Sequence, residues 1–204
     1  MTALDGRRLR GDTSRSAVLA AAVDLASVEG LDGLSIGGLA TTVSRSKGGI
    51  AGLFGSKQEL QLAVVATAAE IFQDRVIRPA LTAPAGLARL RALATAFLDY
   101  SETRVFSGGC FFAAVTAEYR AKPGPVRDAI AAQMRRWRDF LVEAVARAIA
   151  AGDLPASTDA AQLAYEIQAL LDAANDASLL HDTAEPYART RRAVDALLAP
   201  RNLR

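Results

Sequence analysis

Residues 35–60 read SIGGLATTVSRSKGGIAGLFGSKQEL, and this stretch decides the fold. Ser35 is a residue type that caps helix N-termini. The apolar residues behind it recur at the spacing of one helix face, namely Ile36, Leu39, Ala40 and Val43. The pattern therefore predicts a helix over 35–43 that ends near residue 44.

Two more helices are predicted to begin inside the same stretch. Ser46 can cap a short helix over 46–52. Ser56 and Glu59 form an S-x-x-E capping box, which predicts a longer helix that continues to about residue 78, where Pro79 stops it.

Upstream, the sequence predicts a first helix over 14–29, with Ser14 as its N-cap and Gly30 as a left-handed C-cap. Three helices therefore fall within the first 55 residues, and only a few residues separate the second from the third. This is the arrangement of a helix-turn-helix.

The rest of the chain also shows helix signals and no strict apolar/polar alternation. Alanine occupies 44 of the 204 positions, and it is the strongest helix former. Further helices are predicted at 87–104, 109–121, 124–151, 158–181 and 186–199. We therefore expect an all-α fold of about nine helices. Residues 1–60 form the predicted three-helix module, and the next helix begins at its end and continues to about residue 78. Residues 61–204 form the predicted larger body, and 81–86 is the predicted linker.

Composition excludes several classes of protein. A lone Cys110 cannot form an intramolecular disulfide, and a single His181 cannot complete a Cys/His metal cage. We expect no metal and no cofactor. No uncharged stretch reaches the length of a membrane span, and no signal peptide is evident, so we expect a cytoplasmic protein that does not enter a membrane. A net charge of +2 is too small to indicate nucleic-acid binding by itself.

Local placement of charge is more informative than its total. Lys47 and Lys57 each occupy the first position of a predicted helix, where the macrodipole disfavours a cation by about 0.3–1 kcal/mol. A phosphate bound at these positions would turn the unfavourable cations into ligands. Residue types that contact phosphates and base edges surround them, namely Ser35, Thr41, Thr42, Ser44, Arg45 and Ser46. The alternative is that the hydroxyls only cap helices and the lysines form a solvated rim.

A resemblance sharpens this interpretation. The residues 15–22, Gly30, 34–35, 39–40, 46–49 and 54–60 resemble, in order and spacing, the DNA-binding module of the TetR family of bacterial transcriptional regulators. The resemblance implies that 35–43 and 46–52 form the helix-turn-helix, that the second of them enters the major groove, and that Lys57 contacts a phosphate. Together, the charge placement, the residue types and the resemblance give a predicted DNA-binding set of Ser35, Thr41, Thr42, Arg45, Ser46, Lys47, Gly48, Gly49 and Lys57.

The chain departs from the family pattern at three positions. Ala51 and Leu53 stand where the family usually has an aromatic residue and a His, and Ser44 replaces the turn glycine. The resemblance therefore implies fewer backbone contacts or a different register on DNA. Arg7, Arg8 and Arg10 precede the first predicted helix, and they form either a DNA-binding arm or a solubilising tail.

The body carries weaker signals. Aromatic residues gather between 97 and 137, which favours an effector pocket lined by Phe97, Tyr100, Phe111, Phe112 and Trp137, although ordinary core packing is the alternative. Few charges interrupt 105–117, so the expected effector is an apolar or aromatic small molecule. Cys110 is more typical of a small buried hydrophobe than of a redox sensor.

Apolar stripes on the last two predicted helices are suited to helix packing. The resemblance implies that they form a homodimer interface, through Leu163, Ile167, Leu170, Ala174, Val194 and Leu197. The alternative is that these stripes cover the chain's own core.

The leading hypothesis is a homodimeric regulator, typically a repressor, that a small-molecule effector releases from double-stranded operator DNA. A helical enzyme or ligand-binding protein with a structural N-terminal module is the rival. No P-loop or H-E-x-x-H motif supports it, so we expect no enzyme. A third alternative is a module for protein contacts or nonspecific DNA compaction.

Overall fold

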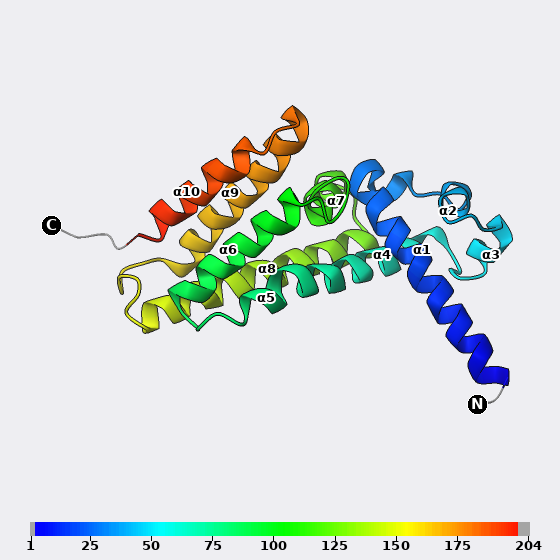
Figure 1. The fold of residues 1–204 in the computed structure, drawn as a ribbon, viewed down its shortest axis with the longest axis horizontal. Helices are drawn as coiled ribbons and strands as arrows, with labels where there is room; N and C mark the ends of the chain where they lie inside the picture. The colour runs from blue at the N-terminus through cyan, green and yellow to red at the C-terminus, as the bar shows by residue number, and fades with distance from the viewer. Residues whose placement is uncertain (1–2, 200–204) are drawn as a thin grey trace. The chain divides into compact units, whose positions relative to one another are not determined.

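The computed structural model describes the backbone of residues 3–199 and the side chains of residues 15–199. Within residues 3–199 the chain is all-α and contains no strand (Figure 1). The helices are α1 (Ala3–Gly33), α2 (Ile36–Thr42), α3 (Lys47–Ala51), α4 (Lys57–Phe72), the π-helix η1 (Gln73–Ile77), α5 (Arg78–Ala80), α6 (Leu87–Glu102), α7 (Phe111–Tyr119), α8 (Pro125–Ala150), α9 (Ala160–His181) and α10 (Glu185–Leu197). Because α4, η1 and α5 follow one another without a break, these residues form nine helical segments, and the predicted fold class is confirmed.

The predicted caps of the helix-turn-helix are confirmed. Gly30 has a φ of 77°, which interrupts α1 where the C-cap was expected. Ser35 Oγ accepts from the N–H of Gly38 at 3.0 Å, and Ser46 Oγ accepts from the N–H of Gly49 at 3.1 Å. Each serine therefore satisfies a backbone donor in the first turn of its helix.

The predicted start of the first helix is wrong. Helix α1 begins at Ala3, so Ser14 lies inside the helix and is not its N-cap. No proline interrupts residues 3–13, and helical hydrogen bonding therefore continues upstream. Arg7, Arg8 and Arg10 consequently fall within α1 and not before it, and their side chains lie outside the described part of the chain.

Pro79 does not stop the fourth helix as predicted. The helix passes through the π-turn η1 and continues to Ala80, with Pro79 near the start of α5. Proline lacks an N–H and its ring clashes with the carbonyl of the preceding turn. A wider π-turn just before the proline relieves this conflict without ending the helix.

The chain divides into two compact units. The first comprises residues 1–69 and 106–130, and the second comprises 70–105 and 131–204. In the first unit the buried face of α1 packs against α7, and α2 packs against α3. Its fully buried side chains include Val18, Leu31, Leu39, Ile50 and Phe111.

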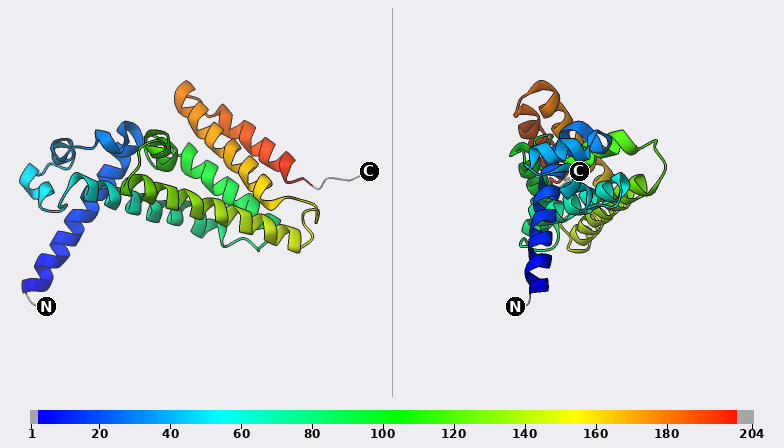
Figure 2. Two further views of the ribbon diagram at one scale, coloured as in Figure 1. Left: turned by 180° about the vertical axis from the view of Figure 1, so that it is seen from behind. Right: turned by 90° about the vertical axis from the view of Figure 1, so that its right-hand side faces the viewer.

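The second unit is a helical bundle. Helices α9 and α10 lie side by side, and α6 packs against both (Figures 1 and 2). Its buried side chains include Phe97, Leu141, Ile167, Leu171 and Tyr187. None of the helices within the described residues is long and apolar enough to cross a membrane.

Candidate nucleic-acid interface

Helices α2 and α3 bury one side and expose the other. Leu39 and Ala40 of α2 and Ile50 of α3 are buried. All nine residues of the predicted DNA-binding set are exposed, namely Ser35, Thr41, Thr42, Arg45, Ser46, Lys47, Gly48, Gly49 and Lys57. The structure therefore places the set on α2, α3, the turn between them and the start of α4, within one compact unit.

The hydroxyls in this set already have partners. Ser35 and Ser46 cap α2 and α3, while Thr41 and Thr42 donate to the carbonyls of Gly37 and Gly38, each at 3.1 Å. These four hydroxyl groups therefore have a structural role within the chain. It does not exclude DNA contacts, because the exposed threonine oxygens can still accept and the serine O–H groups can still donate.

The cations of the set have no carboxylate partner among the described residues. No ion pair among the described residues involves Arg45, Lys47 or Lys57. The Lys47 side chain lies over Gly37, since a Cβ added to Gly37 would come within 3.3 Å of Lys47 Cε. Exposed cations without a carboxylate partner remain available to phosphate oxygens.

Gly48 has no packing reason to be glycine. A Cβ at this position would meet nothing within 4 Å, and Gly48 lies inside α3, where glycine is less favourable than alanine by about 0.5–1 kcal/mol. At Gly49, by contrast, a Cβ would approach Ser46 Oγ within 3.1 Å. The bare backbone at Gly48 therefore suits a surface that approaches from outside the chain.

The departures from the family pattern have clear structural settings. Ser44 has a φ of 51°, so it adopts the left-handed turn conformation that glycine adopts freely, at a cost of about 1–2 kcal/mol. Ala51 is exposed and Leu53 is partly exposed. The structure thus leaves Ala51 on the surface, where it presents only a methyl group.

A cluster of polar residues at the end of α1 was not predicted from the sequence. The backbone N–H groups of Leu31 and Asp32 donate to the carboxylate of Glu118, at 2.7 and 3.0 Å. The Asp32 carboxylate accepts from the Tyr119 hydroxyl and, at 2.8 Å, from Lys122 Nζ. Because these partners lie 86–90 residues apart, no local sequence signal could have revealed them.

These contacts shift the ionisation of their members. The hydrogen bonds from Lys122 and Tyr119 lower the pKa of Asp32 to about 2. Burial and the hydrogen bond to Asp32 raise the pKa of Tyr119, and the hydrogen bond to Asp32 raises that of Lys122. Asp32 and Lys122 therefore stay charged, and Tyr119 stays neutral, across the physiological pH range.

Comparison with known proteins decides the family. Residues 86–194, more than half of the chain, match the family model described as "Tetracyclin repressor-like, C-terminal domain". The chain belongs to the TetR family. TetR regulators are DNA-binding transcriptional regulators that respond to small-molecule effectors, and the predicted function class is confirmed. No curated protein sequence matches the chain significantly.

Solved structures share the fold over almost the whole chain. A TetR regulator from Chloroflexus aurantiacus J-10-FL is 27% identical, with a TM-score of 0.85, and the match covers 92% of this chain and 94% of that one. A TetR regulator from Agrobacterium tumefaciens is 21% identical, with a TM-score of 0.83 and coverages of 93% and 100%. AibR, solved with isovaleryl coenzyme A and operator DNA, is 19% identical, with a TM-score of 0.73 and coverages of 91% and 98%.

The aromatic residues predicted for the TetR effector pocket are all buried. Phe97, Tyr100 and Trp137 lie in the second unit, where they form an aromatic cluster with Phe72 at ring separations of 5.2–6.3 Å. Phe111 and Phe112 lie in the first unit, on α7. The five residues predicted to line one pocket therefore belong to two different compact units.

A polar chain runs beside the aromatic cluster. Trp137 Nε1 donates to Gln168 Oε1, and Gln168 Nε2 donates to Asp172 Oδ1 at 2.7 Å. Burial raises the pKa of Asp172, and no ion pair among the described residues involves it. The second unit thus combines aromatic surface with a hydrogen-bonding carboxyl group that lacks a cation.

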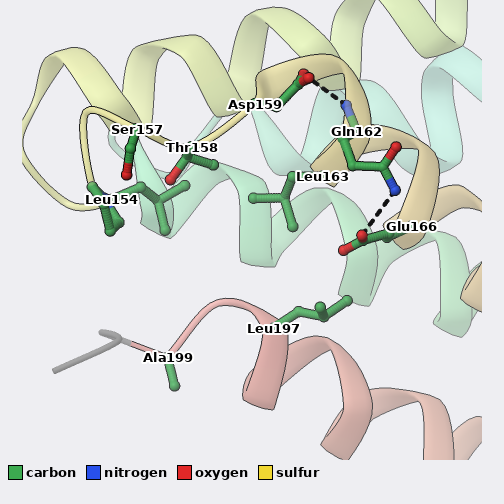
Figure 3. Close-up of a pocket in the computed structure, with 10 residues that line it drawn as sticks. Leu154, Ser157, Thr158, Asp159, Gln162, Leu163, Glu166, Leu197 and Ala199 are labelled. Carbon is green, nitrogen blue, oxygen red and sulfur yellow. Dashed lines mark hydrogen bonds between the residues drawn. The ribbon is translucent and has the colours of Figure 1, made fainter. Parts of the chain in front are cut away.

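The residues predicted for the dimer interface occupy two settings. Leu163, Ile167, Ala174 and Val194 are buried within the single chain, whereas Leu170 and Leu197 are partly exposed. Leu163 and Leu197 also line a cavity of about 250 Å³ between the 154–159 loop, α9 and the end of α10 (Figure 3). Most of the predicted stripe therefore covers the chain's own core.

Proposed function

We propose that this TetR-family regulator is a homodimeric repressor that binds a two-half-site operator through α2 and α3 and leaves it when an effector occupies the second unit. Residues 1–60 supply the DNA-binding module, and 61–204 supply effector binding and dimerisation. The observation that carries the proposal is a set of exposed cations that form no ion pair among the described residues, namely Arg45 in the turn between α2 and α3, Lys47 at the start of α3 and Lys57 at the start of α4.

The DNA contacts divide into two kinds. Lys47 and Lys57 bind phosphates, because both are exposed cations without an intramolecular counter-ion. Residues 45–49 face base edges in the major groove, where Arg45 has the donors to read guanine. The bare backbone of Gly48 permits close approach, and Ala51 forms no polar contact with DNA.

The effector binds at the aromatic cluster of the second unit. Phe97 and Trp137 offer stacking surface, and the Gln168–Asp172 pair offers a polar group beside it. This combination suits an apolar or aromatic molecule with one hydrogen-bond donor. The side chains of the cluster are packed against one another, so binding requires them to rearrange, which gives the effector a conformational change to drive. AibR, solved in complex with isovaleryl coenzyme A and operator DNA, is a protein of this fold that binds both a small molecule and DNA.

The dimer forms through the outer faces of α9 and α10. Tyr165 and Leu180 of α9 are 67% and 79% exposed, which is unusual for large apolar side chains. Leu170 lies between them along the helix and is partly exposed, as is Leu197 of α10. These residues, together with small alanines on the same helices, offer a surface for close helix packing with a second copy. We propose no catalytic activity, because a chain with one His and one Cys has few groups for it.

Selection of operator DNA tests the proposal. The purified protein is incubated with fragments of its own genome, the bound fragments are sequenced, and the protected region is mapped. We expect a palindrome with half-sites about 34–36 Å apart, or a multiple of that distance, bound by a dimer. Fragments without a shared sequence would contradict the proposal and favour nonspecific DNA compaction.

A further inference from the structure

Six residues from three helices and Lys122 meet at the end of α1, and we call these seven residues the α1-end cluster. They are Leu31 and Asp32 of α1, Lys57 and Gln61 of α4, Glu118 and Tyr119 of α7, and Lys122 just after α7. All seven belong to the first compact unit.

Glu118 holds the backbone at this point. Gly30 interrupts α1, and the carboxylate of Glu118 accepts from the N–H groups of the next two residues, Leu31 and Asp32. A Cβ on Gly30 would lie 2.6 Å from Glu118 Oε2, so the carboxylate rests directly against the bare backbone. A residue of α7 thus caps the last turn of α1.

The carbonyl of the same turn binds Lys57. Lys57 Nζ donates to the backbone oxygen of Asp32 at 2.6 Å. An ammonium group has three N–H donors, so this bond uses one and leaves two. Because Lys57 is exposed and forms no ion pair among the described residues, the remaining donors face solvent, with the Asp32 carbonyl fixing the ammonium in place.

The other members lock the turn from the side. Gln61 Nε2 donates to the Leu31 carbonyl and to the Tyr119 hydroxyl, both at 3.0 Å. The Tyr119 hydroxyl in turn donates to the Asp32 carboxylate. Both Gln61 and Tyr119 are buried, so the two bonds that Gln61 donates are shielded from water, whereas the Tyr119–Asp32 bond is only partly buried.

We propose that Glu118 and Tyr119 of α7 are positioning residues for DNA binding, which hold the end of α1 so that the Asp32 carbonyl presents the Lys57 ammonium to a DNA phosphate. This inference rests on the proposed DNA-binding function. It makes the phosphate contact of α4 depend on the position of α7, a helix that contributes no residue to the predicted DNA-binding set.

Glu118→Gln tests the role of Glu118 without a change of volume. The amide has one acceptor where the carboxylate has two, and its NH₂ group would face a backbone N–H. We expect the affinity for the selected duplex, measured by fluorescence anisotropy, to show a salt slope smaller by about one, the loss of one phosphate contact. If wild type and variant bind equally at about 1 M salt, a slope change of 0.9 makes the variant bind about fourfold more weakly at about 0.2 M salt and about fifteenfold more weakly at about 0.05 M salt.

A double-mutant cycle separates positioning from a merely structural role. If Glu118 acts through Lys57, Glu118→Gln in the Lys57→Gln background leaves the slope where Lys57→Gln alone puts it. Ser107→Ala is the matched control, because the Ser107 hydroxyl joins the segment before α7 to Asp24 of α1 at 3.1 Å, outside the α1-end cluster. This control should lower stability with no change in slope.

All variants are measured at a temperature where circular dichroism shows them folded. A Glu118→Gln variant with the slope of Ser107→Ala would overturn the inference, and so would additive slope changes in the cycle. If Glu118→Gln does not fold, Tyr119→Phe takes its place, because it removes only a single hydroxyl. The salt slope of DNA binding by Tyr119→Phe then decides the inference. Wild-type protein that binds no DNA would instead refute the proposed function itself.

Discussion

Replacement of Gly48 by alanine should move stability and DNA affinity in opposite directions. Gly48 lies inside α3 with helical backbone angles, and a Cβ there would meet nothing within 4 Å. The new methyl group therefore encounters no clash within the chain. Alanine loses less backbone entropy on folding, so the free energy of unfolding should rise by about 0.5–1 kcal/mol.

The same methyl group would occupy the space that the DNA uses. Extra methyl groups in a well-packed contact typically cost about 1–3 kcal/mol, which corresponds to binding weaker by about five- to 150-fold. Urea unfolding followed by circular dichroism measures the first effect, and anisotropy with the selected duplex measures the second. Because the variant is the more stable protein, partial unfolding cannot explain a lower affinity.

Unchanged DNA affinity in Gly48→Ala would refute the placement of α3 against DNA. It would show that no DNA atom approaches the backbone of Gly48. The glycine would then have neither a packing reason nor a binding reason, because its surroundings within the chain are open.

Three further outcomes follow from the structure. Lys47→Gln should lower the salt slope of DNA binding by about one, whereas the matched control Arg136→Gln, an exposed cation on α8, should not; equal slopes would remove Lys47 from the interface. Asp32 has its pKa lowered from 3.8 to about 2, so its contribution to stability is present above about pH 4 and is lost as the pH falls toward 2. Since its side chain is 52% exposed, the loss should be about 1 kcal/mol, seen as convergence of the wild-type and Asp32→Asn unfolding free energies between pH 5 and 2; parallel profiles would contradict the assignment. Trp137 is the sole tryptophan and 7% exposed, so its fluorescence should change on titration with an effector that releases DNA; a releasing effector that leaves the emission unaltered would place the effector site elsewhere.

The helices could be predicted from sequence because their end signals are local. Ser35 and Ser46 each bond a backbone N–H only three residues away, and both caps lie where the sequence placed them. Where no local signal existed the prediction failed. Nothing in residues 3–13 marks the true start of α1, and Pro79 looked like a stop because a π-turn that accommodates it leaves no sequence signature.

Burial within the body could not be predicted, because it depends on which helices pack together. The periodicity of α9 and α10 shows an apolar stripe but not its partner, so the sequence predicts Ile167 and Val194 at a dimer interface, with the chain's own core as the alternative. The structure buries both within the single chain. Phe97 and Phe111 likewise looked like members of one set, yet they belong to different compact units.

The sequence predicts the exposed residues of the candidate site but not the residues that hold them in place. Lys57 is predicted because a cation at a helix start is unfavourable, a feature that is visible in the local sequence. By contrast, Lys57 bonds to the Asp32 carbonyl across 25 residues, and Glu118 bonds to the Asp32 N–H across 86 residues. Such contacts arise only from tertiary packing, so the dependence of the DNA-binding surface on α7 required the structure.

The most direct test of sequence-specific binding through α2 and α3 is a titration of the purified protein against two duplexes, one from the region flanking its own gene and one of unrelated sequence. Anisotropy at about 50 and 200 mM salt gives the affinities and the salt slopes. We predict that the flanking duplex binds about a thousandfold more tightly or better. Equal and steeply salt-dependent binding to both duplexes, or no binding to either, would contradict the account.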